Sequence, residues 1–591
     1  MKSFTLRKFI LVILCCMLLT ACGPQETGTD EPSITTSQSS IVEEPFEAST
    51  SAPDETLPDN EENPYDQFAI TIKVNQVGYY PDSSKIAIFP TDTSVTEFNV
   101  VDATTNEVVY TGDLYQKSKE VDSILGDFSD VTEAGQYYIL CQDTDASPIF
   151  TVHDDVYDTL TLDTVKMLYY QRCGTEIYDD TFGHKACHIA KATIYGSKHT
   201  LDVSGGWHDA GDFGRYIVPA AQTVAQLLYA YEAHPTLFGD DTGIPESGNH
   251  ISDLLDEVKY ELEWMMKMQD SSGGVYHKVT CSYHPAIVMP EQELAPLLIT
   301  PISTTATADF CGAMALAYEI YAQVDESFAE DCLKAAKKAW NYLEQHPELI
   351  FENPSDITTG TYEDTKDTDE RYWAAAQMYR ATKDITYWNT LRTLPAENGL
   401  GWQTMGDYGN IALLTTPGID ITSSLYQQVY TSIISQANYY LSVIESSPYD
   451  ISIDTFYWGS NMSVANGSIL LIHAYQLTHD STYLYAAEAN LHYLLGRNGV
   501  DTCFVTGYGQ VSPLHPHHRV SMIVGVPVKG MLAGGVNSFL QDDIVVKILA
   551  TAAPDQCYFD HSASYSTNEV AIYWNSSLTY LLTLLESNYD I

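Results

Sequence analysis

Basic residues are scarce in this chain. Its 591 residues include 28 lysines and arginines against 79 aspartates and glutamates, which gives a formal net charge of −51. So strong a negative field repels nucleic acid and anionic lipid surfaces, and we expect no nucleic-acid partner. A neutral polymer is not repelled. Aromatic residues make up 12% of the chain, so flat rings that can stack on sugars are available in addition to those of the core.

A membrane-spanning run is missing from the N-terminus. The apolar run there covers only residues 9–19, after a start that carries Lys2, Arg7 and Lys8, and it is too short to span a bilayer comfortably. It ends in LLTAC, residues 18–22, which resembles a bacterial lipoprotein signal whose cysteine is lipidated. The alternative is an ordinary secretory signal with a chance cysteine. We expect residues 1–22 to be a signal peptide and the exported protein to be anchored through Cys22 on the extracellular face of the bacterial membrane.

Residues 23–67 contain no lysine or arginine and are rich in Ser, Thr, Pro, Asp and Glu. Such a segment cannot bury enough apolar surface to fold, and its like charges keep it extended. The sequence predicts a disordered acidic linker between the anchor and the folded domains.

The rest of the chain changes pattern once. Short β-branched and aromatic runs, separated by turn residues, fill residues 68–153 and predict a small β-sandwich. From residue 156 to 590, roughly a dozen segments repeat apolar residues at helical spacing, and several are apolar on most faces, as inner helices are. A barrel of paired helices fits this pattern, although periodicity alone also allows an irregular helical array.

Three loop segments carry candidate chemistry. GGWHDAGDFGRY (205–216) holds Asp209 and Asp212 among glycines, although a solvated acidic loop or a calcium loop would look similar. Glu569 stands between a polar turn and an apolar helix, where an acid also simply favours the helix dipole. SPLHPHHR (512–519) packs three histidines beside Arg519; a metal site is one interpretation, but the arginine would oppose a cation.

Together these segments resemble glycoside hydrolase family 9, the inverting cellulases and their relatives. The resemblance runs through DVSGGWHDAGDFGRY, GGVYHKVT, PISTTATADF, DERYWAAA, GRNGVDTCFVTGYG, SPLHPHHR, GMLAGGVN and YSTNEVAIYWNSSL, in the family's order. VNQVGYYP resembles the opening of the immunoglobulin-like domain found in one subgroup. The resemblance implies an immunoglobulin-like β-sandwich followed by an (α/α)6 barrel.

The same resemblance implies roles for individual residues. Asp212 matches the general base, Asp209 the acid that helps hold the water, and Glu569 the general acid. Asp560 matches a further acid of the catalytic set. His517 and Arg519 match the substrate-binding pair beside the cleavage point, with His517 also counted as catalytic, and Trp207 and Tyr565 are expected to contact substrate.

Chemistry supports this division of roles independently. Cleavage of a glycosidic bond needs one protonated carboxyl and one ionised carboxylate. The acid should lie in apolar surroundings that raise its pKa, as the residues around Glu569 suggest, and the base in a polar loop, as around Asp212.

Two metals are expected. Cys173, Cys187, His188 and His208 form a Cys2His2 set that suits tetrahedral zinc, although an exported protein also invites disulfides. Family relatives with the immunoglobulin-like domain carry a structural zinc on this pattern. The resemblance also implies a structural calcium near YEDTKDTDER, with Asp369 and Glu370 as candidate ligands, and Asp240 and Asp241 form a weaker candidate.

The sequence thus predicts a monomeric endo-β-1,4-glucanase acting on cellulose or a related β-glucan. Two alternatives stay open: an exo-acting cellodextrinase or glucosaminidase of the same fold, and a catalytically inactive glucan-binding lipoprotein.

Overall fold

The computed structural model describes residues 71–142 and 144–589. The predicted signal peptide, Cys22 and the predicted linker lie outside these residues. Within them, no helix combines the length and apolar character needed to cross a membrane.

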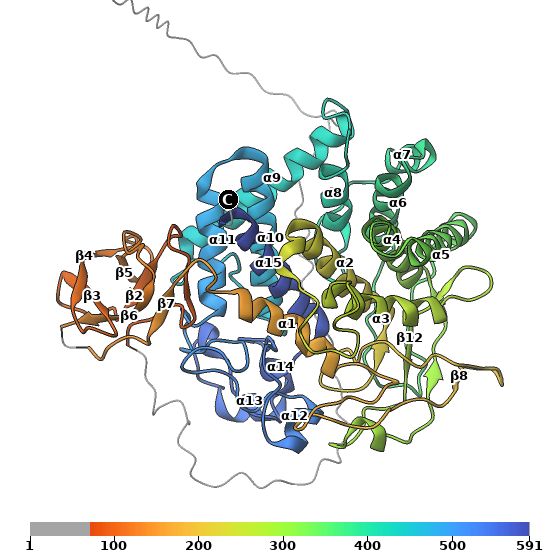
Figure 1. Cartoon of the computed structure of the whole chain (residues 1–591), viewed down its shortest axis with the longest axis horizontal. Helices are drawn as coiled ribbons and strands as arrows, with labels where there is room; N and C mark the ends of the chain where they lie inside the picture. Colours follow the sequence, from red (N-terminus) through yellow and green to blue (C-terminus); the bar gives the residue numbers. More distant parts are fainter. Residues whose placement is uncertain (1–70, 143, 590–591) are drawn as a thin grey trace, which may run out of the picture. The chain divides into compact units, whose positions relative to one another are not determined.

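A β-module comes first. Its seven strands are β1 (Gly78–Tyr79), β2 (Ile86–Phe89), β3 (Glu97–Asp102), β4 (Val108–Gln116), β5 (Ile124–Asp127), β6 (Gly135–Cys141) and β7 (Phe150–Val152) (Figure 1). They are hydrogen-bonded in the order β1-β7-β6-β3-β4-β5-β2. The long strand β4 pairs antiparallel with β3 along one part and with β5 along the other, and so joins the two halves of the sandwich.

Aromatic rings fill the sandwich. Phe98 and Phe89 are buried and lie with ring centroids 5.3 Å apart. Gly126 is needed between them, because a Cβ at this position would lie 2.6 Å from the ring of Phe98. The β-branched and aromatic residues of the short runs in the sequence therefore form this core.

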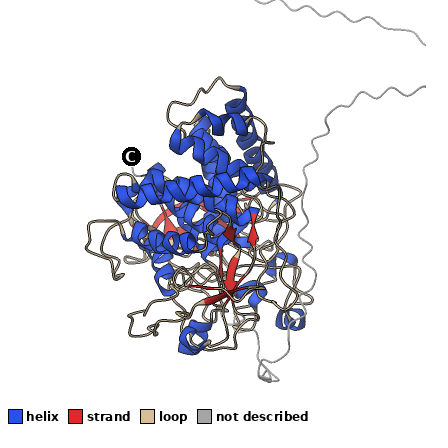
Figure 2. Ribbon diagram, turned by 90° about the vertical axis from the view of Figure 1, so that its right-hand side faces the viewer, coloured by secondary structure: helices blue, strands red, loops and turns tan. Residues whose placement is uncertain are grey.

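Twelve helices alternate between an outer and an inner position along the chain. The inner six are buried on nearly every face: α2 (Ile217–Ala233), α4 (Thr304–Tyr321), α6 (Thr368–Thr382), α8 (Gly406–Leu414), α10 (Ser460–Thr478) and α15 (Ile572–Tyr589). The outer six are α1 (Asp158–Tyr170), α3 (Asp253–Lys267), α5 (Glu326–Gln345), α7 (Ile385–Leu391), α9 (Ser424–Ser446) and α11 (Ser481–Leu494). Helix α15 packs against α2 and closes the ring, and Figure 2 shows the helices gathered in one body. The predicted (α/α)6 barrel is confirmed.

Composition explains which helix lies inside. In α2 every residue from Ile217 to Ala230 is buried, so no polar face exists to turn toward water. In α5 the buried residues recur at three and four spacing, and its exposed face carries charged residues. Asp325 caps α5 by accepting a hydrogen bond from the Phe328 amide.

The loops contain more strand than the sequence predicts. Five short strands form one sheet in the order β10-β12-β13-β8-β9: β8 (Ala192–Ile194), β9 (Thr200–Leu201), β10 (Arg215–Tyr216), β12 (Lys278–Thr280) and β13 (Leu298–Ile299). A second pair joins β11 (Val275–Tyr276) and β14 (Ile302–Ser303). Short helices complete the loops: η2 (Pro235–Leu237), η3 (Pro290–Gln292), α12 (Arg519–Val524), α13 (Asp543–Ile548), η4 (Pro554–Gln556) and α14 (Tyr565–Asn568). Strands of two or three residues are too short to show a period of two, which is why the sequence does not predict them.

The β-module and the helical domain belong to one compact unit. The side chain of Gln76 accepts hydrogen bonds from the amides of Gln510 and Val511 at 2.9 and 3.0 Å. Asn75 lies 3.1 Å from His492 Nδ1, and both are buried. The signature VNQ, quoted above for the opening of the β-module, therefore makes contacts to the helical domain.

Candidate active site

The candidate site lies where chain segments enter inner helices. Asp209 and Asp212 precede β10 and α2, and Glu569 lies between α14 and α15. Because α2 and α15 are neighbours in the ring, their leading segments meet. The amide of Ile572 donates to the carbonyl of Asp209 at 2.9 Å. The structure thus brings Glu569 to the loop of Asp209 and Asp212, although the two segments are far apart in the sequence.

Asp212 is held by hydrogen-bond donors. Its Oδ2 accepts from the Gly214 amide and lies 3.2 Å from His284 Nδ1. Burial raises the pKa of this carboxyl, but the hydrogen bond and charge of His284, with the charge of Arg519, outweigh burial and hold it below its ordinary value. Asp212 is therefore an ionised carboxylate, as a base must be.

Glu569 shows the opposite shift. Burial, and then the negative charge of Asp212, raise the pKa of the Glu569 carboxyl well above its ordinary value. Such a shift favours the protonated carboxyl, which is the form that a general acid needs. Opposite shifts on two neighbouring carboxyl groups are what acid–base catalysis at one bond requires.

Asp209 lies deeper than Asp212. It is 2% exposed, and burial is the main cause that raises its pKa well above the ordinary value, with the charge of Asp212 adding to it. The hydroxyl of Tyr362, a residue of the segment that precedes α6, donates a hydrogen bond to Asp209 Oδ2. Oδ1 is buried and has no hydrogen-bond partner among the described residues. Of the two oxygens, Oδ1 is therefore the one without a donor, and its contact with the attacking water stays a prediction.

Asp560 fixes the histidine-rich segment. Its carboxylate accepts hydrogen bonds from the amides of Leu514 and His515 at 2.7 and 2.8 Å and from the Asn568 side chain at 2.8 Å. These donors use both oxygens. The carboxylate therefore positions the loop next to Glu569, and a catalytic role of Asp560 stays a prediction.

His517 faces the site as a neutral ring. Burial, and then the charge of Arg519, lower its pKa to about 4. Its Nδ1 lies 2.6 Å from the carbonyl of Ser562, which can only accept, so Nδ1 carries the proton and Nε2 is an acceptor. Tyr565 lies beside it, with its ring centroid 6.0 Å from that of His517 and 5.3 Å from that of Trp458.

Arg519 joins two loops. Its Nη1 donates to the carbonyl of Gly211 at 2.8 Å, while Nε and Nη2 donate to the carbonyl of Pro285 at 3.2 and 3.0 Å. Gly211 must be glycine, since a Cβ there would lie 2.0 Å from the carbonyl oxygen of His517. The predicted contact of Arg519 with substrate stays a prediction; the contacts present are to the backbone.

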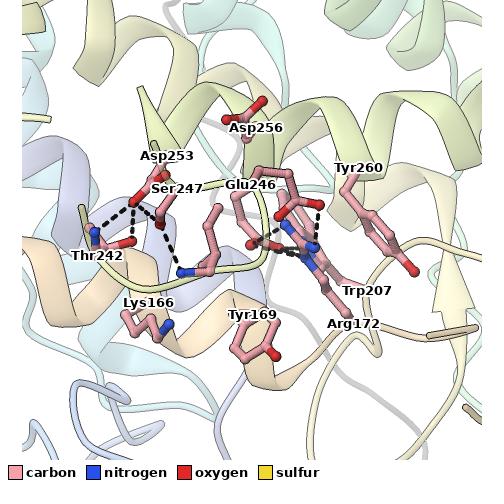
Figure 3. A network of polar contacts seen from close by, with 12 residues as sticks. Lys166, Tyr169, Arg172, Trp207, Thr242, Glu246, Ser247, Asp253, Asp256 and Tyr260 are labelled. Atoms are coloured by element: carbon pink, nitrogen blue, oxygen red, sulfur yellow. Dashed lines mark hydrogen bonds and ion pairs between the residues drawn. The ribbon is translucent and has the colours of Figure 1, made fainter. Parts of the chain in front are cut away.

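Trp207 does not face the site, which corrects the prediction that it binds substrate. Its side chain is 1% exposed, and its indole Nε1 donates to Glu257 at 2.7 Å. Figure 3 shows Trp207 in the interior beside Arg172, which pairs with the same glutamate and with Glu246. No face of the indole is left for a sugar ring.

The four predicted zinc ligands come together. Donor atoms of Cys173, Cys187, His188 and His208 all lie within 4.8 Å of one another. The sulfurs are 3.7 Å apart, so no disulfide joins them. His188 Nε2 lies 3.0 Å from a Glu293 oxygen, the type of outer contact that orients a metal-bound imidazole. The residues fit a tetrahedral zinc ion.

A second group of metal-type ligands is acidic. Single carboxylate oxygens of Asp240, Asp253 and Asp256 lie within 4.8 Å of one another, whereas Asp241 is not in the group. Thr242 and Ser247 donate to Asp253 Oδ2 (Figure 3), but the buried Oδ1 has no hydrogen-bond partner among the described residues. An orphaned oxygen in a set of three carboxylates fits a calcium ion.

Asp369 and Glu370 belong to neither group of ligands found in the described part of the chain. They begin α6 and are buried. Asp369 Oδ1 lies 3.4 Å from the Lys366 ammonium, which also lies 2.9 Å from Glu397. Both oxygens of Glu370 are buried and have no hydrogen-bond partner among the described residues. Calcium at the start of α6 therefore stays a prediction, with Lys366 as a nearby positive charge.

Two site residues escape the sequence analysis. His284 and Tyr362 contact Asp212 and Asp209 from loops that carry no pattern of their own. The one signal in the sequence is that Tyr362 directly precedes the acidic run 363–371.

Comparison with known proteins gives matches over both folded parts. Residues 157–582 match the family model "Glycosyl hydrolase family 9", and residues 67–146 match "Cellulase N-terminal ig-like domain". A cellodextrinase of Butyrivibrio fibrisolvens is 34% identical over 87% of this chain and 99% of its own length. A xyloglucan-specific endo-β-1,4-glucanase of Bacteroides ovatus is 33% identical over 87% of this chain and 94% of its own.

A solved structure gives the same result. A single mutant of the thermostable endoglucanase from Alicyclobacillus acidocaldarius superimposes with a TM-score of 0.81 and 34% identity. The match covers 87% of this chain and 99% of that one. Both the β-module and the helical domain therefore have counterparts in one solved protein.

Proposed function

Because this chain belongs to glycosyl hydrolase family 9, we propose that it hydrolyses internal β-1,4-glucosidic bonds of cellulose or a related β-glucan with inversion. The observation that carries the proposal is the pair of opposite pKa shifts on Asp212 and Glu569, whose segments meet at the ends of α2 and α15. The endo-β-1,4-glucanase and endoglucanase matches support the substrate class.

The reaction needs one proton transfer at each carboxyl group. Glu569 gives its proton to the glycosidic oxygen as the bond from that oxygen to the anomeric carbon breaks. A water molecule attacks the anomeric carbon from the opposite face, and Asp212 takes its proton. Asp209, through its unpartnered Oδ1, helps to hold that water. The product on the non-reducing side of the cleaved bond is then the α-anomer.

Proton NMR during the first minutes of cellohexaose hydrolysis tests this reaction. We expect the α-anomer to form first and the β-anomer to appear only by mutarotation. An initial β-anomer would contradict the role of Asp212 as a base, and no hydrolysis at all would favour a glucan-binding protein.

A second candidate function is exo-acting cellodextrin hydrolysis, which the similarity to the cellodextrinase favours. Viscosity and reducing ends of carboxymethylcellulose separate the two. An endo-acting enzyme lowers viscosity steeply while few reducing ends form, whereas an exo-acting enzyme releases short sugars with little loss of viscosity.

We propose two structural metals. Zinc would be held by Cys173, Cys187, His188 and His208, and calcium by Asp240, Asp253 and Asp256. Neither is proposed to take part in bond cleavage. The four proposed zinc ligands are joined directly to the loop of Asp209 and Asp212, because His208 immediately precedes Asp209. The supporting observation in each case is the convergence of the donor atoms.

We also propose that the protein is exported and lipid-anchored at the extracellular face of the bacterial membrane. The support is the sequence of residues 1–22, which lies outside the described residues. Expression in a bacterial host with labelled palmitate tests it: we expect label on the wild type and none on Cys22→Ala. Unlabelled but secreted wild-type protein would indicate an ordinary signal peptide.

A further inference from the structure

The loop between β12 and η3 reaches the proposed base from outside the acid-bearing segments. It carries His284, whose Nδ1 lies 3.2 Å from Asp212 Oδ2. The His284 side chain is 38% exposed, while that of Asp212 is 9% exposed. The imidazole therefore stands between the carboxylate and solvent.

The position of His284 is fixed by its neighbours. Pro285, the next residue, accepts through its carbonyl from Nε and Nη2 of Arg519, and Nη1 of the same guanidinium donates to Gly211. One rigid group thus holds both His284 and the Asp212 loop. The start of the loop is tied as well, since the Thr358 amide donates to the carbonyl of Ser282 at 2.8 Å.

The contact leaves the two oxygens of Asp212 in different states. Oδ2 accepts from the Gly214 amide and from His284, whereas no hydrogen bond from the described residues reaches Oδ1. A carboxylate with one oxygen occupied by donors has a fixed rotation, and its other oxygen is the one that accepts a proton from water.

We propose that His284 is a positioning residue for the general base: its ring holds Asp212 Oδ2 and so orients the carboxylate toward the attacking water. The proposal rests on the proposed function, in which Asp212 is the base. The Nδ1–H group of the imidazole donates the hydrogen bond, and without this donor the carboxylate is free to rotate.

Other charged and titratable groups also face this pair. They are Asp209 in the same loop, Lys278 in β12, His517 and Arg519 in the histidine-rich segment, and Glu569 ahead of α15. Lys278 needs particular care, because burial lowers its pKa to about 7 despite the charge of Asp212. The test must therefore change only the ring of His284.

Two substitutions separate the hydrogen bond from the bulk of the ring. The amide of His284→Asn places a donor near the position of Nδ1, and His284→Ala removes the donor. His199→Asn is the matched control, since His199 is an exposed loop histidine. Rates on cellohexaose would be measured from pH 4 to 9, with circular dichroism and melting curves to show that each variant is folded.

We expect His284→Ala to lose about tenfold in kcat with KM nearly unchanged, because a hydrogen bond to a charged group is lost. We expect His284→Asn to keep kcat within about threefold of the wild type, because it retains a donor near the position of Nδ1. His199→Asn should match the wild type.

A folded His284→Asn that loses about tenfold or more in kcat overturns the proposal, even if His284→Ala does not fold, because a donor at this place would then not be what positions the carboxylate. A change in KM alone in His284→Ala also overturns it, since the residue would then bind substrate. Failure of the proposed function has a different signature: Asp212→Asn would remain active.

Discussion

The two segments that supply the proposed acid and base are both buried, yet they shift a carboxyl pKa in opposite directions. Asp212 accepts hydrogen bonds from the Gly214 amide and the ring of His284, and the positive charge of Arg519 lies nearby. Around Glu569 burial dominates, and the nearby charges of Asp212 and Asp209 reinforce it. Burial alone therefore does not assign a role to a carboxyl group; the hydrogen-bond donors around it decide whether it keeps its charge.

The segments also differ in how they are held. The base loop is tied by Arg519, by Tyr362 through Asp209, and by the zinc set through His208. Glu569 is placed by backbone pairing: its carbonyl accepts from the Gly534 amide at 2.9 Å, and the amide of His517 donates to Asn568 at 2.8 Å. Side chains position the base, and the backbone positions the acid.

The largest expected effect is that of Asp212→Ala. Without a base to activate water, activity should fall by about 10²–10⁴-fold on cellulose and by a similar factor on a dinitrophenyl cellobioside, because no leaving group replaces the base. Kinetics on both substrates check this, with added azide expected to restore part of the rate. Equal activity of the variant and the wild type would place the site elsewhere.

Glu569→Ala should depend on the leaving group. On cellulose the loss should reach about 10²–10⁴-fold. On the dinitrophenyl cellobioside it should be far smaller, because dinitrophenolate leaves without a proton. If instead Glu569→Ala loses equally on both substrates while Asp212→Ala recovers on the activated one, the two roles are reversed.

The same pair predicts the pH window. A general acid works protonated, so activity is lost as pH rises through the raised pKa of Glu569; a base works ionised, so activity is lost as pH falls through the lowered pKa of Asp212. With the activated substrate, Glu569→Gln should lose the alkaline limb and keep the acid limb. An alkaline limb that persists in this variant would have to come from another group.

Most of the fold follows from the sequence, and part of the site does. Helix periodicity and the fully apolar segments predict the ring of inner helices, and the loop motifs predict Asp209, Asp212 and Glu569. His284 and Tyr362 could not be predicted, because their roles depend on which loops the ring order brings together. Trp207 misled for a physical reason: among glycines it looks exposed, but Glu257 of α3 binds its indole in the interior.

Zinc removal should disturb the loop of Asp209 and Asp212 more than the segment that carries Glu569. Elemental analysis should find about one zinc per chain, and Cys187→Ser should lose it, melt at lower temperature and lose activity as the Asp209 loop loosens. Cys332→Ala is the matched control, because Cys332 is buried in α5 outside the ligand set. A Cys173–Cys187 disulfide in the purified protein would contradict the zinc site.

The smallest effect on catalysis is expected for removal of calcium. Its proposed ligands lie in the first turn of α3 and in the loop before this helix, away from the segments of the proposed acid and base. An ion that binds only the folded state raises the melting temperature with concentration. Adding calcium to chelator-treated wild type should therefore raise the melting temperature by a few degrees while kcat stays within about twofold. Asp253→Asn should abolish the calcium-dependent shift, since it changes the carboxylate whose Oδ1 has no hydrogen-bond partner among the described residues.

Asp369→Asn is the informative counterpart, because Lys366 already lies beside that carboxylate. This variant should melt at a lower temperature at every calcium concentration but keep the full calcium-dependent shift. If Asp369→Asn loses the shift and Asp253→Asn keeps it, calcium binds at the start of α6, as the sequence suggested, and the lysine does not replace it.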